Sequence, residues 1–127
     1  MNRITRLTAG VLSAGAAVAG FALATGAPAQ ALAKSPSTVT IQAEGVDLSG
    51  DVTSTNQGCL VDRTVIVYKQ VGTRGGGDDV RFASDTTEDD GSWNTGNTGT
   101  EGFFYAKVKA NLTCGRDFSP TIHAVRN

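Results

Sequence analysis

The stretch RTVIVYK at residues 63–69 is the strongest β-strand signal in the chain. Most of its residues are β-branched or aromatic, which are the side chains that strands favour. A second stretch, FFYAKVKA at residues 103–110, alternates in the way that a half-buried strand requires. Phe104, Ala106 and Val108 are expected to face a core, and the lysines between and beyond them are expected to face water. These two stretches predict the long strands of a β-sheet.

Shorter segments of the same kind surround this pair, separated by turns rich in Gly, Asn and Asp. They occupy residues 38–42, 50–54, 79–85, 92–94 and 121–125. Nothing in the chain after residue 33 shows a helical period with caps. Seven short strands in a small domain predict an all-β fold, a seven-stranded antiparallel β-sandwich, with a small closed barrel as the alternative. The expected core consists of Ile41, Val65, Val67, Trp93, Phe104, Ala106 and Val108.

Residues 1–33 have the three zones of a cleavable signal peptide. Two arginines precede an uncharged apolar segment at residues 7–24, and residues 31–33, ALA, form the small-x-small pattern that signal peptidase accepts. Cleavage after Ala33 leaves residues 34–127 as one domain of a secreted, extracellular protein with no membrane segment. An uncleaved membrane anchor is the alternative, because the apolar segment is about long enough to span a bilayer. Its Gly, Ser and Thr residues and its small-residue ending favour cleavage.

The net charge of the mature chain limits the classes of partner that we expect, and its cysteines indicate the compartment in which it folds. Without the two signal-peptide arginines, 9 Lys and Arg face 12 Asp and Glu, a net charge of −3. The basic residues form no cluster in the sequence, so nucleic acid and an anionic membrane are not expected as partners. Cys59 and Cys114 are expected to form a disulfide in an oxidising compartment. A bridge across a loop of about 56 residues stabilises the fold by about 4 kcal/mol through chain entropy.

Three segments stand in an order that is known from one family. They are RTVIVY at residues 63–68, SDTTEDDGSW at residues 84–93 and GFFYAKV at residues 102–108. This order resembles the prealbumin-like sandwich, also called the carboxypeptidase regulatory-like or transthyretin-like domain. The placing of the two cysteines, just before the first segment and just after the last, resembles small secreted actinobacterial proteins of this architecture.

The resemblance implies a prealbumin- or immunoglobulin-like sandwich in which Asp90 and Gly91 form a tight turn and Trp93 returns to the core. It also implies a scaffold, stalk or binding module, because such folds do not by themselves define an activity. Transthyretins carry a Tyr-rich C-terminal strand, and relatives that hydrolyse 5-hydroxyisourate use several His and Arg residues. This chain has a single His and no such strand, so neither hormone transport nor that hydrolysis is expected.

The sequence offers little for catalysis or for metal binding. His123 is the only histidine and no Ser lies in a Gly-x-Ser-x-Gly elbow, so neither a catalytic triad nor a tetrahedral zinc site is expected. We predict that the protein is not an enzyme and uses no cofactor. The only calcium candidate is the acidic group Asp85, Glu88, Asp89 and Asp90. Its spacing fails the EF-hand pattern at both anchoring positions, so a solvated turn is the default interpretation.

A mixed aromatic and basic patch is the remaining candidate site. Its residues are Tyr68, Lys69, Tyr105, Lys107 and Lys109. We therefore expect a secreted, non-catalytic β-sandwich that binds an extracellular protein or a cell-wall glycan. The alternative is a small inhibitor of an extracellular hydrolase that presents residues 71–79 or 95–102 to its target. The glycines of these loops count against that alternative, because they predict flexible connections and inhibitor loops are normally rigid.

Overall fold

The computed structural model describes residues 33–127, so the predicted signal peptide lies outside the described residues except for Ala33. Nine strands make up this part of the chain: β2 (Thr38–Val39), β3 (Gln42–Glu44), β4 (Asp47–Thr53), β5 (Thr64–Lys69), β6 (Val80–Thr86), β7 (Ser92–Asn97), β8 (Gly102–Val108), β9 (Asp117–Phe118) and β10 (Ile122–Ala124). A short 3₁₀ turn, η2 (Gln57–Cys59), precedes β5. Residues 33–127 include no helix with the length and apolar character of a membrane span. The all-β prediction is confirmed.

Seven strands were expected and nine are found, because one expected segment is split into two strands and one short strand was not expected. The expected strand at 38–42 is split at Thr40, whose amide donates to the Asp51 carbonyl at 2.9 Å and whose hydroxyl accepts from the Asp51 amide at 3.0 Å. This local exchange separates β2 from β3, which pair with successive parts of β4. The additional strand β9 is only two residues long and pairs with the end of β8.

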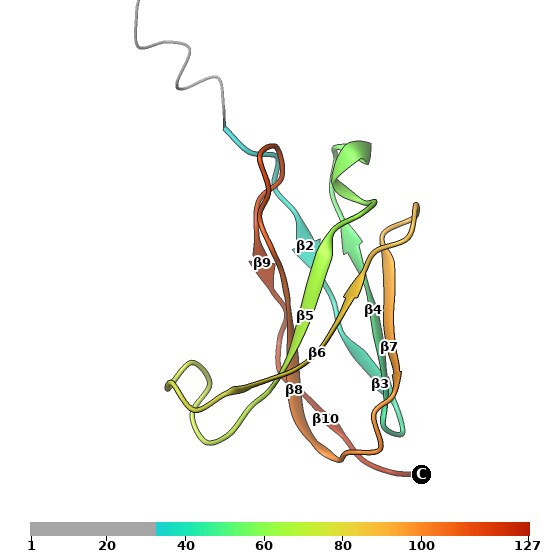
Figure 1. Ribbon diagram of the computed structural model, residues 1–127, viewed down its shortest axis with the longest axis vertical. Coiled ribbons are helices and arrows are strands. Elements are labelled where there is room, and N and C mark those ends of the chain that lie inside the picture. The colour runs from blue at the N-terminus through green and yellow to red at the C-terminus, as the bar shows by residue number, and fades with distance from the viewer. Residues whose placement is uncertain (1–32) are drawn as a thin grey trace, which may run out of the picture. The chain divides into compact units, whose positions relative to one another are not determined.

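The strands form two antiparallel sheets (Figure 1). The five-stranded sheet has the order β10-β8-β5-β6, and β9 pairs with β8 on the same edge as β10. In the four-stranded sheet, β4 is central and pairs with β2 and β3 on one side and with β7 on the other. A register shift between Val67 and Tyr68 marks a bulge where β5 pairs with β6, which bends the edge strand.

One hydrophobic core joins the two sheets in a sandwich-like arrangement. All seven residues expected in the core belong to it, and it also contains Val39, Leu48, Val52 and Ala124. The alternation of strands accounts for this, because the even-numbered residues of β8 point inward as predicted. Trp93 packs beneath Gly50, where an added Cβ would lie 2.0 Å from the Thr40 carbonyl oxygen and 2.9 Å from the Trp93 ring. Only glycine fits at that position.

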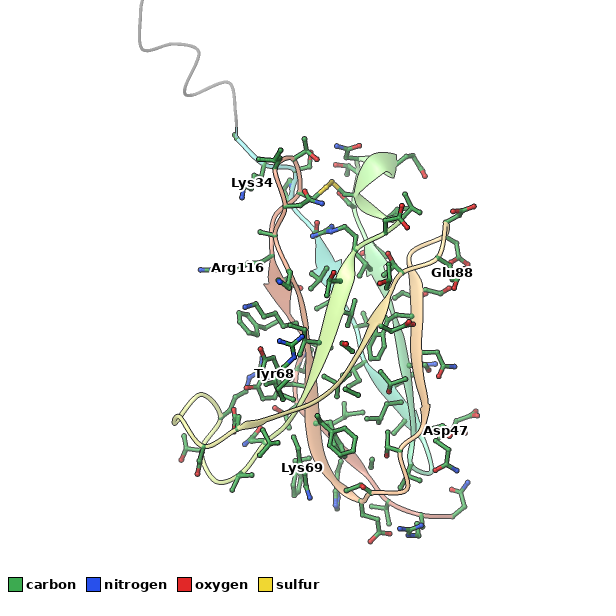
Figure 2. All side chains as sticks on the ribbon, viewed as in Figure 1. Lys34, Asp47, Tyr68, Lys69, Glu88 and Arg116 are labelled. Atoms are coloured by element: carbon green, nitrogen blue, oxygen red, sulfur yellow. A yellow bond between two sulfur atoms is a disulfide. The ribbon has the colours of Figure 1, made fainter. Side chains whose placement is uncertain are left out.

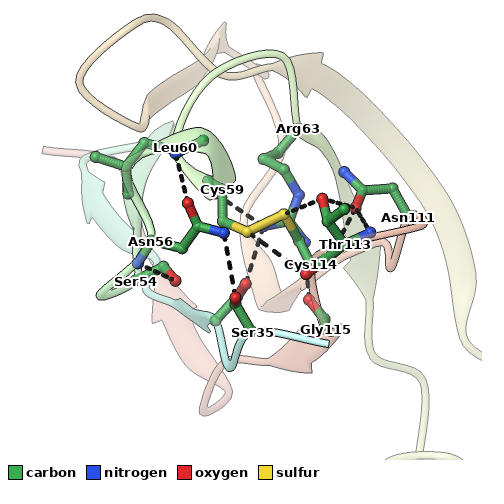
Figure 3. Close-up of a disulfide and its surroundings, with 12 residues drawn as sticks. Ser35, Ser54, Asn56, Cys59, Leu60, Arg63, Asn111, Thr113, Cys114 and Gly115 are labelled. Atoms are coloured by element: carbon green, nitrogen blue, oxygen red, sulfur yellow. Dashed lines mark hydrogen bonds between the residues drawn. A yellow bond between two sulfur atoms is a disulfide. The ribbon is translucent and has the colours of Figure 1, made fainter. Parts of the chain in front are cut away.

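A disulfide closes one end of the molecule (Figure 3). Cys59 in η2 and Cys114 in the loop after β8 are bonded, with their Cα atoms 5.6 Å apart, which confirms the predicted bridge. The N-terminal segment also joins this end, because Ser35 donates its amide to the Thr113 carbonyl and accepts from the Gly115 amide, both at 2.8 Å. The start of the described chain is thereby tied to the loop that carries Cys114.

Arg63 fills the space beside the disulfide with its guanidinium group (Figure 3). It is buried, and its terminal nitrogens donate four hydrogen bonds of 2.8–2.9 Å. The acceptors are the carbonyl oxygens of Cys59, Lys109 and Gly115 and the hydroxyl of Ser37. Burial removes the guanidinium from water and thereby lowers its pKa. The four acceptors are neutral, so none of them offers a compensating negative charge. Arg63 therefore links three separate segments around the disulfide.

Candidate functional site

The aromatic side chains of the described residues are distributed between the core and one surface only. Phe82, Trp93 and Phe104 pack in or against the core. The other four lie on the side of the five-stranded sheet that points away from the core, and they are Tyr68, Phe103, Tyr105 and Phe118. Strand alternation explains this placement, because Phe103 and Tyr105 flank the inward-pointing Phe104 on β8. The outer side of the four-stranded sheet carries no aromatic residue in β2, β3, β4 or β7.

The strand register brings these outward-facing rings into contact. Tyr68 and Tyr105 lie directly opposite each other and stack with their ring centroids 5.4 Å apart. Phe118 lies next, with its centroid 6.5 Å from that of Tyr105. Phe103 stacks against His123 on β10 at 4.3 Å, where the exposed histidine side chain agrees with the expected solvent-facing position. We call this surface the aromatic face.

The glycine-rich loop at residues 70–79, between β5 and β6, is fastened to this face by Asp79. One carboxylate oxygen of Asp79 accepts from the Val71 amide at 3.1 Å. The other accepts from the Gly75 amide at 2.9 Å and from the Tyr105 hydroxyl at 2.5 Å. These bonds fasten the base of the loop, whose glycines at residues 75–77 are exposed as predicted; their flexibility stays a prediction. The contacts of the loop reach both its own backbone and the sheet.

Arg74 holds the same loop over the aromatic face. Its guanidinium carbon lies 4.1 Å from the centre of the Tyr105 ring, within cation–π range. One of its nitrogens donates to the Thr121 hydroxyl at 3.1 Å, and that hydroxyl in turn donates to the Gln70 side-chain carbonyl at 2.7 Å. Tyr105 is consequently only 6% exposed. The loop and the sheet form one composite surface.

Burial and the neighbouring carboxylate change the ionisation of both partners in this contact. Desolvation, followed by the hydrogen bond and the negative charge of Asp79, raises the pKa of Tyr105 to about 12. The Tyr105 hydroxyl and then the Gly75 amide hold the pKa of Asp79 below its usual value. At neutral pH the pair is therefore a tyrosine hydroxyl donating to an ionised carboxylate.

The predicted aromatic and basic patch is only partly assembled. Tyr68, Tyr105 and Lys107 share the aromatic face, and the Lys107 ammonium lies 5.6 Å from the centre of the Phe118 ring. Lys69 does not belong to it, because it lies opposite the buried Phe104 and so points to the other side of the sheet. Lys109 follows the end of β8 and is exposed, and its carbonyl accepts from Arg63. Tyr105 lies on the aromatic face but is buried beneath the loop, so its ring is not open to a partner as a patch residue would be.

Several residues of the aromatic face were not anticipated from the sequence. They are Arg74, Asp79, Arg81, Phe103, Arg116 and Phe118. Arg81 lies opposite Tyr68 on β6 and is exposed. Arg116 precedes Phe118 by two residues and points away from the body of the molecule (Figure 2). Because Arg74, Arg81 and Arg116 come from three separate segments, the sequence contains no basic cluster that could have revealed them.

The charges of the two sheets differ in sign. The strands of the five-stranded sheet contain three cations, Lys69, Arg81 and Lys107, and two carboxylates, Asp85 and Asp117. The strands of the four-stranded sheet contain Glu44, Asp47 and Asp51 and no Lys or Arg. In Figure 2, Asp47 and Glu88 lie on the side of the molecule opposite Arg116. The protein therefore combines a net negative charge with one surface on which cations and aromatic rings are interleaved.

The four candidate calcium ligands are not gathered into a metal site. Asp85 accepts from the Asn94 amide at 2.8 Å, and Asp90 accepts from the amide and the hydroxyl of Ser92 at 3.0 and 2.7 Å. These bonds shape the turn between β6 and β7, and the two from Ser92, that of its hydroxyl first, lower the pKa of Asp90. Asp85 and Glu88 border a shallow hollow of about 300 Å³. Across residues 33–127, no three His, Cys, Asp or Glu side chains are grouped so that they could hold a metal ion.

Comparison of the chain with protein-family models, with curated proteins and with solved structures finds no match. The resemblance to the prealbumin-like sandwich therefore stays a prediction, and the function has to be argued from the surface itself.

Proposed function

We propose that residues 34–127 form a secreted, non-catalytic binding module that holds an extracellular partner on its aromatic face. In this proposal residues 1–33 are a signal peptide, the mature domain is a prealbumin-like sandwich, and the protein acts outside the cell. The disulfide supports an oxidising compartment. The proposal rests chiefly on one observation, the gathering of all outward-facing aromatic rings of the described residues on one of the two sheets.

Such a one-sided distribution is typical of a binding surface. Large apolar side chains are costly to leave in water, and patches of them on small soluble proteins commonly mark interaction sites. Phe103 and Phe118 are 50% and 47% exposed, respectively. Tyrosine and arginine are also the residues that contribute most often to binding energy at interfaces. The polar outer side of the four-stranded sheet lacks these features.

The contacts within the face also favour binding. Arg74 is held by the Tyr105 ring and by Thr121, and Lys107 lies near the Phe118 ring. Side chains that are already fixed lose less conformational entropy when a partner binds, which improves affinity. The face is thus prepared for binding before the partner arrives.

The test uses the protein recovered from the medium of cells that express the full chain. N-terminal sequencing should begin at Lys34, and a different start would contradict the proposed cleavage. The recovered protein is then sedimented with the cell-envelope fraction of the same organism. The double variant Phe118→Ser/Lys107→Gln should weaken retention by about ten-fold, the loss expected when an interface loses a central contact.

The matched control is the double variant Gln42→Ala/Asp51→Asn on the outer side of the four-stranded sheet. It should be retained like the unchanged protein, and both variants should keep the unfolding temperature within a few degrees. Retention that falls equally in both variants, or in neither, would contradict the assignment of the aromatic face.

A second function is favoured by one specific observation. The loop at residues 70–79 is hydrogen-bonded at its base through Asp79, which weakens the objection that its glycines make it too flexible for an inhibitor. Added protein at micromolar concentration should then inhibit one of the proteases or amylases of the culture supernatant, and Asp79→Asn should relieve that inhibition. Absence of inhibition across the panel would exclude this function.

A further inference from the structure

We propose that the ligand of the aromatic face is an anionic polysaccharide, a sugar polymer whose units carry carboxylate or phosphate groups. This inference rests on the proposed binding function and specifies its ligand class. It follows from the excess of cations on the face, from their spread over separate segments, and from the exposed aromatic rings beside them.

The charges on the face are predominantly positive although the protein as a whole is acidic. Arg74, Arg81, Lys107 and Arg116 come from the loop, β6, β8 and the segment before β9. The carboxylates beside them are Asp78 and Asp79 in the loop, and Asp79 is engaged by Tyr105 and two amides. An excess of cations attracts an anionic ligand and repels a cationic one.

The cations are spread across the face and do not converge on one pocket. Arg74, Arg81, Lys107 and Arg116 lie on four separate segments, and successive outward positions on one strand are already about 6.6 Å apart. Two surface hollows, one beside Trp93 and Asn94 and one beside Pro36 and Thr55, are lined by none of these cations. Spaced charges on an open surface suit a polymer with repeated anionic groups, because each group adds to the same binding event.

The centre of the face is occupied by a cation. The guanidinium of Arg74 covers Tyr105, and the most exposed rings, Phe103 and Phe118, flank it. Arginine and tyrosine are also frequent at the centre of protein interfaces, so an acidic protein is the competing partner that the experiment below separates from a polysaccharide.

Exposed aromatic surface lies beside the cations. Tyr105 contacts Tyr68 and Arg74, and Phe103 stacks on His123. The exposed parts of Phe103 and Phe118 can pack against the C–H surface of a sugar ring. A nucleic-acid base can stack on the same surface, so single-stranded nucleic acid is the other class of partner that the experiment below separates from a polysaccharide.

The experiment compares four soluble polymers immobilised for binding measurements with the secreted protein. They are polygalacturonate as the acidic polysaccharide with carboxylates, teichoic acid as the one with phosphates, polyglutamate as an acidic polypeptide and oligo(dT) as a nucleic acid. Dextran is the uncharged control. One of the two acidic polysaccharides should bind at least about ten-fold more tightly than polyglutamate or oligo(dT), and raising salt from about 0.05 M to about 0.5 M should weaken it strongly.

The variants separate the aromatic face from nearby charges. Lys107→Gln and Arg116→Gln should each weaken binding by about three-fold to ten-fold, as expected for a contributing charge contact. Lys69→Gln removes the same charge from the other side of the sheet and should leave binding unchanged. Phe118→Ala should weaken binding to the polysaccharide more than binding to polyglutamate.

Three results would overturn the inference. Binding to dextran as tight as to the acidic polysaccharides would show that charge is not recognised. Tighter binding to polyglutamate or oligo(dT) would assign another class of partner. A loss of binding in Lys69→Gln equal to that in Lys107→Gln would show that the aromatic face is not the site of the interaction. If no polymer binds while the cell-envelope fraction still retains the protein through this face, the anionic-polysaccharide assignment fails and the proposed binding function stands. If retention by the envelope is also absent, both fail.

Discussion

Replacing Arg63 by methionine should destabilise the protein by about 3 kcal/mol, because each buried acceptor that is left without a donor costs about 1–3 kcal/mol and the relieved desolvation of the guanidinium offsets part of that cost. Methionine keeps most of the aliphatic volume but removes all four hydrogen bonds to Ser37, Cys59, Lys109 and Gly115. Hydrogen bonds from a charged donor contribute about 1.5–3 kcal/mol each. In the unchanged protein, the cost of keeping the guanidinium out of water without a negatively charged partner is several kcal/mol, and it offsets part of what these hydrogen bonds contribute.

Arg63→Lys separates geometry from charge. A lysine ammonium preserves the positive charge but cannot span acceptors that a planar guanidinium reaches with two terminal nitrogens. We therefore expect Arg63→Lys to lose at least half as much stability as Arg63→Met.

Urea unfolding with the disulfide intact measures these differences, provided that the slope with denaturant stays constant. Arg81→Met is the matched control, because Arg81 is exposed and its loss should change stability by no more than about 0.5 kcal/mol. The reasoning is refuted if Arg63→Met costs less than about 1 kcal/mol, or if Arg63→Lys is as stable as the unchanged protein.

Three further predictions concern the disulfide, the core and the loop contact. Cys59→Ala/Cys114→Ala should lower the free energy of unfolding by about 4 kcal/mol in the same assay, and a loss below about 1 kcal/mol would contradict the chain-entropy argument. Gly50→Ala should cost at least about 2 kcal/mol, because the added methyl group overlaps a backbone carbonyl oxygen; an unchanged unfolding midpoint would show that the space exists. In an ultraviolet titration, Tyr105 should ionise at about 12, and Asp79→Asn should lower that midpoint; no shift would mean that the two side chains are not in contact in solution.

The same contact also links stability to pH at both extremes. The pKa of Asp79 is lower in the folded protein, so its stabilising effect is complete above the ordinary Asp value of about 3.9 and is lost as pH falls through the lower folded value. The pKa of Tyr105 is raised, so its stabilising effect is complete below the ordinary value near 10 and is lost as pH rises through about 12. The loop contact is therefore unaffected near neutral pH.

The core and the disulfide could be predicted from the sequence because local rules determine them. Alternation alone assigned Val65, Val67 and Phe104 to the interior, and a chain with two cysteines allows only one internal pairing. The same rule would have excluded Lys69 from the binding patch, since it follows Tyr68 directly and must point to the opposite side of the sheet. Grouping neighbouring residues without applying the alternation produced that error.

The loop and the cationic surface could not be predicted, because both depend on segments that are distant in the sequence. Three consecutive glycines at residues 75–77 indicate flexibility, and nothing local shows that Asp79 will accept bonds from Gly75 and Tyr105. Arg74 and Arg116 likewise meet the rings only after the sheet has formed. Such contacts follow from the tertiary fold and not from composition.

The binding face is tested most directly by mapping backbone amide shifts of the isotope-labelled secreted protein while cell-envelope fragments released by muramidase are added. The aromatic face predicts progressive shifts at Lys107, Phe118 and His123 and none on the outer side of the four-stranded sheet. Shifts at Ser49 and Asn94, with the aromatic face unchanged, would contradict the central claim.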